Sequence, residues 1–418
     1  MANKGVKLFL STIMLGGLAG CGAGGSSSGS GNSVNAKKPI VVGSLLDATG
    51  DMNVYGKPMI DATNLAISDI NAHGGVLGRP LKLVAYDTQS DMSKYTQYAT
   101  QLILKDKAAV IEGGIPSASR EAIRAVADRY NEMYFQNIMY EGGVCDSLEF
   151  NTGAVPEQQL SVLIPWALQK FGKKVYIVAA DYGFGHTSTS WADTYVKKSG
   201  GTVVGQEFIP LQVTDFSSTI SKIQEAKPDV IISLLVGGNH MSFYNQMASA
   251  GLRSKFPIVS TTFGLGNEQI VLDPKAAQGI IVSFPYFQNL NNPANNAFVA
   301  LWHKTYGNNY PYIPDAAEDV WNGWHLWAEA VNKAGSLDRS KVTKVLESGL
   351  TYDSPEGPIT MDGSSHIVVH NIHIAEVDAN HGFKILQTFN NVAPTWDDSV
   401  CNLVQNPNLH KQFTFTAK

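Results

Sequence analysis

The sequence predicts an α/β fold in which parallel sheets are covered by helices on both faces. From Pro39 to about Pro285, short apolar segments alternate with segments of helical periodicity. These short segments are apolar on both faces, as the strands of doubly covered parallel sheets are. Two consecutive sets of such strand–helix units predict two similar lobes, and 418 residues are enough for both.

The strands are expected in two sets that follow each other along the chain. The first set is 40–46, 81–87, 108–113 and 133–138, and the second is 174–180, 202–209, 229–235, 257–261 and 279–285. Helices are expected between them at 58–73, 93–106, 117–130, 158–171, 215–226 and 241–250. The alternation favours parallel pairing within each set.

The pattern changes after residue 285. Three helical segments follow, at 294–306, 315–334 and 339–348. The segments 357–362, 366–377 and 383–389 then have the pattern of antiparallel strands. The remaining residues, 391–418, contain Pro and Asn and are expected to form an irregular tail.

The N-terminus has the pattern of an exported lipoprotein. Lys4 and Lys7 precede an apolar run, Leu8–Leu18, that is too short to span a bilayer and suits a signal peptide. Cys21 follows in the sequence Leu-Ala-Gly-Cys, which resembles the bacterial lipobox, so residues 1–20 are expected to be removed and Cys21 lipidated. The Gly/Ser-rich residues 21–37 then form a flexible tether. The alternative is a buried N-terminal helix with a chance cysteine.

Two further cysteines remain, Cys145 and Cys401. Export to an oxidising compartment favours a disulfide between them. The alternative is a pair of buried thiols.

Charge and motifs argue against several classes of function. The net charge of −5 gives no basic excess for binding nucleic acid. There is no phosphate-binding Gly-x-x-x-x-Gly-Lys-Ser/Thr motif, and the one Gly-x-Ser-x-Gly match, at 25–29, lies in the tether with no strand before it. His366, His370 and His373 lie in one expected strand, but no acidic or thiol side chain lies near them at the spacing that metal ligands need. We therefore expect that the protein is not an enzyme and that it binds neither a cofactor nor a metal ion.

Ligands of open parallel sheets bind outside the carboxyl ends of the strands. The loops that follow the expected strands are rich in Gly, Ser, Thr, Asn or aromatic residues, and they span 46–51, 111–120, 181–187, 236–240 and 262–267. A binding site for a small molecule is expected where they meet.

Several motifs along the chain resemble one family. They include "IVVGSLLDATGDMNVYGKPMIDATNLAISDINAHGGVLGRPLKLVAYDTQSD", "GGIPSASREA", "MYEGGVCD", "ADYGFG" and "PEGPITMDGSSH". Together they resemble the branched-chain-amino-acid type of type I periplasmic binding proteins, and within it the urea and short-chain-amide branch. The resemblance covers nearly all of residues 38–397.

The resemblance implies two Rossmann-like lobes joined by three hinge crossings, near Val155, Pro285 and Pro358. Lobe 1 would comprise 38–155 and 286–358, lobe 2 would comprise 156–285 and 359–390, and 391–418 would be the tail. It also implies capture of a small molecule by hinge closure outside the cytoplasm, and delivery to an ABC permease with separate ATPase subunits.

The resemblance further implies the ligand-binding residues. Ser117 of "GGIPS", Tyr140 of "YEG" and Tyr182 match family positions that contact ligand, and Thr49 and Gly237 lie in two of the expected loops. Three positions depart from the family: Ile115 and Gln136 replace residues of the amide-binding relatives, and Phe263 stands where amino-acid-binding relatives have an acidic residue.

These departures leave the ligand class open. Phe263 cannot form an ion pair with the α-ammonium group of an amino acid. A standard amino acid is therefore disfavoured as the ligand, unless Asp47 or Asp181 supplies the carboxylate. Urea, a short amide or a related nitrogen compound is the leading expectation. An amino acid, a small organic cation held on aromatic rings, and a sensor that regulates a partner protein are the alternatives.

Overall fold

The structure is a computed structural model that describes residues 37–237 and 240–417. The expected signal peptide, Cys21 and nearly all of the tether lie outside these residues. In the part of the chain that is described, no helix combines the length and the apolar character needed to cross a membrane.

The first sheet is parallel throughout and contains five strands in the order β2-β1-β3-β4-β6. Its strands are β1 (Ile40–Leu46), β2 (Leu81–Asp87), β3 (Ile111–Gly113), β4 (Tyr134–Gln136) and β6 (Glu149–Asn151). The order places β3 at the centre of the sheet, so the loop that follows β3 lies between the loops that follow β1 and β4.

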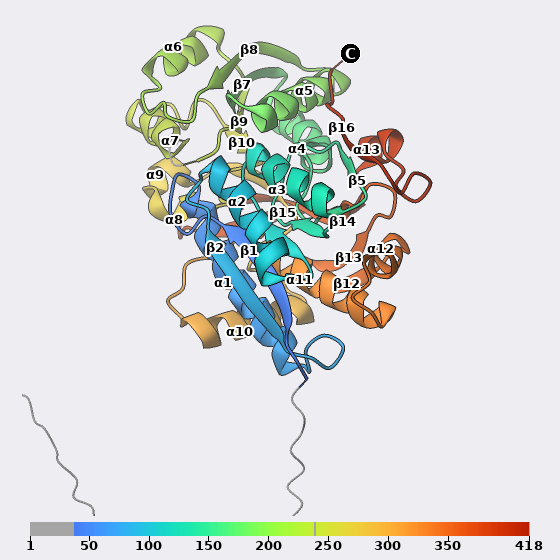
Figure 1. The fold of residues 1–418 in the computed structure, drawn as a ribbon. Helices are drawn as coiled ribbons and strands as arrows, with labels where there is room; N and C mark the ends of the chain where they lie inside the picture. Colours follow the sequence, from blue (N-terminus) through green and yellow to red (C-terminus); the bar gives the residue numbers. More distant parts are fainter. Residues whose placement is uncertain (1–36, 238–239, 418) are drawn as a thin grey trace, which may run out of the picture. The chain divides into compact units, whose positions relative to one another are not determined.

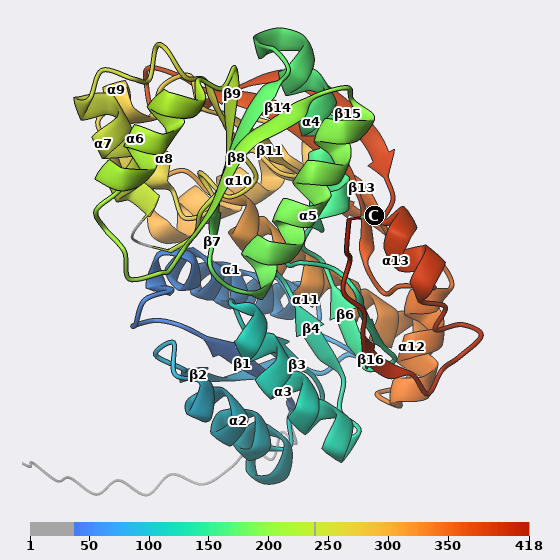
Figure 2. The same ribbon diagram turned by 90° about the horizontal axis from the view of Figure 1, so that it is seen from above.

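Helices cover both faces of this sheet (Figures 1 and 2). On one face lie α1 (Asn53–Ala72) and α11 (Asp315–Ala334), and on the other lie α2 (Met92–Gln101), its π-helical continuation Leu102–Asp106, and α3 (Ser117–Tyr130). Successive side chains of β1 alternate between the two cores, as the pleat of a strand requires. A doubly covered parallel sheet is therefore confirmed for the first set of strands.

The second sheet has a parallel part and an antiparallel part. The parallel strands are β7 (Lys174–Ala180), β8 (Thr202–Ile209), β9 (Val230–Leu234), β10 (Ile258–Ser260) and β11 (Ile281–Phe284). The antiparallel strands are β12 (Thr351–Ser354), β13 (Gly357–Met361), β14 (Val368–Val377) and β15 (Phe383–Val392). Strand β14 joins the two parts, because it pairs with β11, β13 and β15.

Strand β7 of the second sheet is buried on both faces. Its side chains at 175, 177 and 179 pack in one core with α4 (Pro156–Phe171) and α5 (Gly183–Lys198). Those at 176, 178 and 180 pack in the other core with α6 (Ser217–Ala226) and α7 (His240–Ser249). The predicted α/β fold with two lobes is thus confirmed.

Between β6 and β12 the chain passes three times between the bodies of the two sheets. It leaves β6 for α4, returns from β11 to α11, which packs on α1, and passes from α12 (Arg339–Glu347) to β12. The short helices α8 (Glu268–Val271) and α9 (Pro274–Ala277) and the longer α10 (Pro293–Tyr306) complete the two lobes.

The structure differs from the sequence prediction at several places in the fold, and it adds the strands β5, β6 and β12 to those expected. Helix α1 begins at Asn53, before the expected residue 58, because a buried face that includes Tyr55 and Met59 outweighs the one hydrogen bond lost at Pro58. The expected irregular tail contains α13 (Thr395–Val400) and β16 (His410–Gln412), and β16 pairs with β5 (Val144–Asp146).

Candidate ligand-binding site

A pocket lies where loops from both sheets meet. Met52, Tyr55, Ile115, Pro116, Ile138 and Met139 line it from the loops and helix starts that follow β1, β3 and β4. Tyr182, Phe184, Val236 and Leu265 line it from segments that follow β7, β9 and β10. All these strands are parallel, so the pocket lies at the carboxyl ends of both sheets, as expected for open α/β sheets.

The pocket is narrow and apolar. Its side chains leave a cavity of about 30 Å³, which is room for about two water molecules. Among the described residues that line it, the polar side-chain groups are the hydroxyls of Tyr55 and Tyr182, and none is charged. A ligand larger than water can enter only if the two walls move apart.

A hydrogen bond crosses the pocket from one lobe to the other. The amide N–H of Gly237, after β9, donates to the hydroxyl of Tyr55, on α1, over 2.9 Å. Gly237 has φ of +80°, a conformation that glycine adopts at little cost. Burial, and next the charge of Glu268, raise the pKa of Tyr55 well above its usual value, so its hydroxyl stays protonated and keeps a hydrogen to donate.

The half-buried Ser117 and the buried Glu141 and Arg120 form a hydrogen-bonded polar group beside the pocket. Ser117 is the first residue of α3, and its hydroxyl donates to Glu141 Oε2 over 2.8 Å. Arg120, one turn further along α3, donates to Glu141 Oε1 over 2.8 Å. Burial favours a raised pKa for Glu141, but the charge and hydrogen bond of Arg120 outweigh it, so the pKa of Glu141 is lowered and the carboxylate stays ionised.

This polar group faces the second lobe. A methyl group built on Gly183, the first residue of α5, would lie 3.9 Å from Glu141 Oε1. The guanidinium of Arg120 lies 5.0 Å from the centre of the Tyr140 ring, and the Tyr140 hydroxyl has no hydrogen-bond partner among the described residues. Ser117 and Tyr140 thus lie at the edge of the site, although they do not line the pocket.

Two of the predicted residues lie directly on the pocket. Ile115 and Tyr182 line it from opposite lobes, and Gly237 reaches it through the hydrogen bond to Tyr55. These three come from three of the loops that were expected to converge.

Asp47 and Thr49 are engaged within their own lobe. The carboxylate of Asp47 is fully buried and accepts hydrogen bonds from the Thr88 hydroxyl, from the amide and hydroxyl of Ser90, and from the Tyr95 hydroxyl. Thr49 is exposed and donates to Asp87 over 2.7 Å. With its oxygens occupied in this way, Asp47 has none directed at a ligand ammonium, and Asp181 pairs with His186 over 2.9 Å.

Gln136 and Phe263, which were predicted to bind ligand, do not line the pocket. Gln136 is fully buried in β4, and neither of its amide atoms has a hydrogen-bond partner in the described chain. The Phe263 ring packs edge-on against Tyr244, with 4.6 Å between ring centres. Leu265, two residues later, lines the pocket instead.

Sequence reasoning missed most of the apolar lining. Phe184, Val236 and Leu265 lie inside loops that were singled out, but their apolar character gave no reason to choose them over polar neighbours. Met52 and Tyr55 were missed because α1 begins earlier than predicted, which brings its first turn to the pocket.

The predicted strand histidines have separate partners. His366 contacts Glu347, His370 contacts Glu356 and His373 contacts Thr388. Within the described residues, one group of such side chains has ligand atoms within 4.8 Å of one another, namely Asp128, Asp146 and His410. Asp146 already accepts hydrogen bonds from Leu148, Arg124 and His410, so we assign no metal site there.

Comparison with known proteins gives a family match over most of the chain. A family model described as periplasmic binding protein matches residues 39–382. The Leu/Ile/Val-binding protein homolog 6 of Brucella melitensis is 24% identical over 332 residues, which are 76% of this chain and 84% of that protein. Homolog 7 of Brucella suis is 24% identical over 335 residues, which are 75% of this chain and 82% of that protein.

Two solved structures are similar in fold. A solute binding protein of an ABC transporter from Rhodopseudomonas palustris, in complex with 3,4-dihydroxybenzoic acid, has a TM-score of 0.76 at 24% identity and covers 86% of this chain and 99% of its own. An amino acid ABC transporter substrate-binding protein from Pseudomonas fluorescens has a TM-score of 0.77 at 21% identity, with 86% and 98% coverage.

Proposed function

This chain belongs to the periplasmic binding protein family, and from this membership we propose that it is the solute-binding component of an ABC importer. It acts outside the cytoplasm, held to a membrane by a lipid on Cys21, and presents its solute to a permease with separate ATPase subunits. The observation that carries the proposal is the pocket between the two sheets, because residues of both lobes line it.

The lining favours a small and largely apolar solute. An ionised group enclosed there without a partner would cost several kcal/mol, and no described lining side chain is charged. Tyr55 and Tyr182 offer two hydroxyls from opposite walls. A neutral aromatic or branched aliphatic molecule with one or two hydrogen-bonding groups fits this arrangement best.

Capture follows from hinge closure. Ligand contacts on both walls, together with the Tyr55–Gly237 hydrogen bond, stabilise the closed arrangement relative to the open one. The cavity of about 30 Å³ is too small for such a solute, so the lobes separate to admit it and close around it.

The urea and short-amide expectation remains a second candidate, supported by the sequence motifs alone. A molecule as small and polar as urea would leave most of the apolar lining uncovered. A free amino acid carries two charges, and an organic cation one, for which the described lining offers no ion pair. The sensor alternative is not favoured, because the signal-peptide and lipobox pattern favours an exported, lipid-anchored protein.

A thermal-shift screen tests this assignment. The panel contains benzamide and benzyl alcohol as neutral aromatics, benzoate and 4-hydroxybenzoate as aromatic acids, and leucine, urea, acetamide and tetramethylammonium. A true ligand at a hundredfold excess over its Kd should raise the melting temperature by roughly 3 °C. We expect the neutral aromatics to give the largest shift. A shift with urea or acetamide alone would restore the amide assignment, and one with leucine alone would make this an amino-acid-binding protein.

A further inference from the structure

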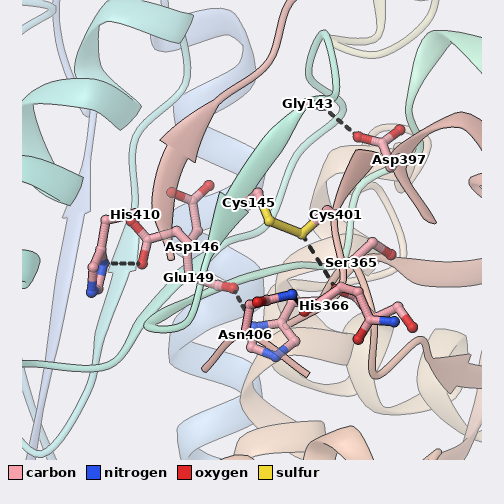
Figure 3. The surroundings of a disulfide bond; sticks show 12 residues. Gly143, Cys145, Asp146, Glu149, Ser365, His366, Asp397, Cys401, Asn406 and His410 are labelled. Carbon is pink, nitrogen blue, oxygen red and sulfur yellow. Dashed lines mark hydrogen bonds and ion pairs between the residues drawn. A yellow bond between two sulfur atoms is a disulfide. The ribbon is translucent and has the colours of Figure 1, made fainter. Parts of the chain in front are cut away.

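The C-terminal segment, defined here as residues 393–417, contacts the loop 138–146, which follows β4. Asp397 Oδ1 accepts a hydrogen bond from the Gly143 amide over 2.5 Å (Figure 3). The Gln412 side chain donates to Gly142 O over 3.0 Å, and the Phe413 amide donates to Gly143 O over 2.7 Å. Both glycine carbonyls and the Gly143 amide are thus bound by this segment.

The next residues of the loop are fixed to the same segment. Cys145 and Cys401 form a disulfide, drawn in Figure 3, and β16 pairs with β5 in antiparallel register, with His410 opposite Asp146. Every residue from 142 to 146 is therefore bonded to the C-terminal segment or lies in a strand paired with it.

The two adjacent glycines of this loop allow the C-terminal segment to pack closely against it. Gly142 and Gly143 have φ of +79° and +83°. A Cβ on Gly143 would lie 2.0 Å from the Phe413 carbonyl oxygen, so the segment approaches more closely than any side chain would allow. "MYEGGVCD" thus needs its glycines for the contact with residues 397–413.

The loop held in this way carries one wall of the pocket. Ile138 and Met139 line the pocket, Glu141 follows two residues after Met139, and the C-terminal contacts begin at Gly142. Few rotatable bonds separate the pocket wall from the segment. A shift of the segment would therefore move that wall.

The segment also attaches to the second lobe. The Phe415 ring stacks on Trp191 of α5 with 3.5 Å between ring centres and 7° between planes, and Trp396 meets Trp191 edge-on at 5.9 Å. The carboxylate of Glu157, on α4, accepts from the Thr395 hydroxyl and from the Trp396 amide, both at 2.8 Å or less. Helix α5 is the helix whose start carries Tyr182 and Phe184, on the opposite pocket wall.

We propose that the C-terminal segment is a positioning element that couples the loop 138–146 to helix α5 and so sets the spacing of the two pocket walls. The coupling is a property of the empty protein, while its effect on solute capture rests on the proposed function. Because Phe415 and Cys401 lie in one short segment, a change at the α5 end is transmitted to the loop end.

Hydrogen–deuterium exchange of the ligand-free protein tests the coupling without a known ligand. Phe415→Ala removes the ring that stacks on Trp191 of α5 and that also meets Trp396 edge-on within the segment itself. We expect exchange to accelerate roughly three- to tenfold in residues 183–190, as the loss of an aromatic pair allows, and also in residues 139–146 of the other lobe. Exchange in the central strand β9 should not change, which separates the effect from a global loss of stability.

Two further variants complete the experiment. The double variant Cys145→Ser/Cys401→Ser releases the loop end and should accelerate exchange at the start of α5. Val404→Ala, in the same segment but 57% exposed, is the matched control and should change neither region. If Phe415→Ala accelerates exchange in α5 alone, or in neither region, the coupling is wrong. A failure of every solute in the screen would leave this result unaffected and would count against the proposed function only.

Discussion

The hydroxyl of Tyr55 joins the two lobes, because it accepts a hydrogen bond from the Gly237 amide across the pocket. Tyr55→Phe leaves that amide without its partner in the closed form, while in the open form water can bind it. We expect the closed form to lose about 1–2 kcal/mol, and the affinity for the best solute of the screen to fall roughly 5- to 30-fold by calorimetry.

The matched control for this prediction is Tyr98→Phe. The Tyr98 ring stacks on Tyr86 on the other side of the first sheet, away from the pocket. It should leave the affinity within twofold of the wild type. Equal affinities for the two variants would remove the Tyr55–Gly237 bond from the mechanism of closure.

Arg120 and Glu141 are expected to act as one buried unit. Arg120→Met leaves the Glu141 carboxylate, which is 7% exposed, without its ion pair, and should lower the free energy of unfolding by about 3 kcal/mol. The double variant Arg120→Met/Glu141→Gln removes both charges and should recover more than half of that loss in urea denaturation. Additive losses in the double-mutant cycle would show that the two residues act independently.

At the residue scale, the sequence predicted which loops form the site better than which side chains do. Ile115 and Tyr182 were found because family motifs mark their positions. Asp47 was not excluded, because its four hydrogen bonds come from residues 41 to 48 positions away, which no local pattern reveals. Apolar lining residues such as Leu265 look like ordinary core residues until the fold places them.

At the scale of elements, α1, β3 and α11 enclose an acidic side chain. Glu112 of β3 is 1% exposed, accepts a hydrogen bond from Thr63 of α1 over 3.2 Å, and has a second oxygen without a partner in the described chain. Burial raises the pKa of Glu112 from 4.5 to about 8. At neutral pH this carboxyl group is therefore protonated in the folded protein and ionised in the unfolded chain.

The sign of the pH dependence follows from this difference. Between pH 4.5 and about 8 the folded state holds a proton that the unfolded state has lost, so this group's contribution to stability falls as pH rises, by about 1.4 kcal/mol per pH unit. Glu112→Gln removes that slope. Urea denaturation at pH 5 and pH 7.5 should show a smaller loss of stability in the variant. An unchanged slope would mean that Glu112 is ionised in the folded protein.

The elements that sequence predicted well are those with strong local patterns. Buried strands such as β1 of the first sheet and β7 of the parallel part of the second sheet have apolar runs, and α11 has an amphipathic repeat, so their positions follow from hydrophobic periodicity. Strands β5 and β16 were missed because each has three residues and is stabilised by its partner from the far end of the chain and by a disulfide that spans 256 residues.

At the scale of the whole molecule, the N-terminal pattern predicts a membrane-anchored protein. Expressed in a bacterium with lipoprotein processing, the wild-type chain should incorporate labelled palmitate and sediment with membranes, because two or more acyl chains give stable anchoring. Cys21→Ser should abolish both the label and the sedimentation. Label in the variant, or an unlabelled wild-type protein that stays in the soluble fraction, would contradict the lipobox assignment.

The central claim is that one solute binds between the two lobes, against walls contributed by both sheets. It rests on the convergence of six strand-end segments on one apolar pocket and on the hydrogen bond from Gly237 to Tyr55 across it. The family membership gives the general role, and the lining residues support the class of solute that we propose.

A crystal structure of the protein with the strongest hit of the thermal-shift screen tests this claim most directly. We expect the solute to lie between Ile115 and Tyr182, enclosed by the two lobes, in a cavity larger than the present 30 Å³. Density for the solute elsewhere, for example in the surface groove between Lys198 and Phe415, with the interlobe pocket unchanged, would contradict it.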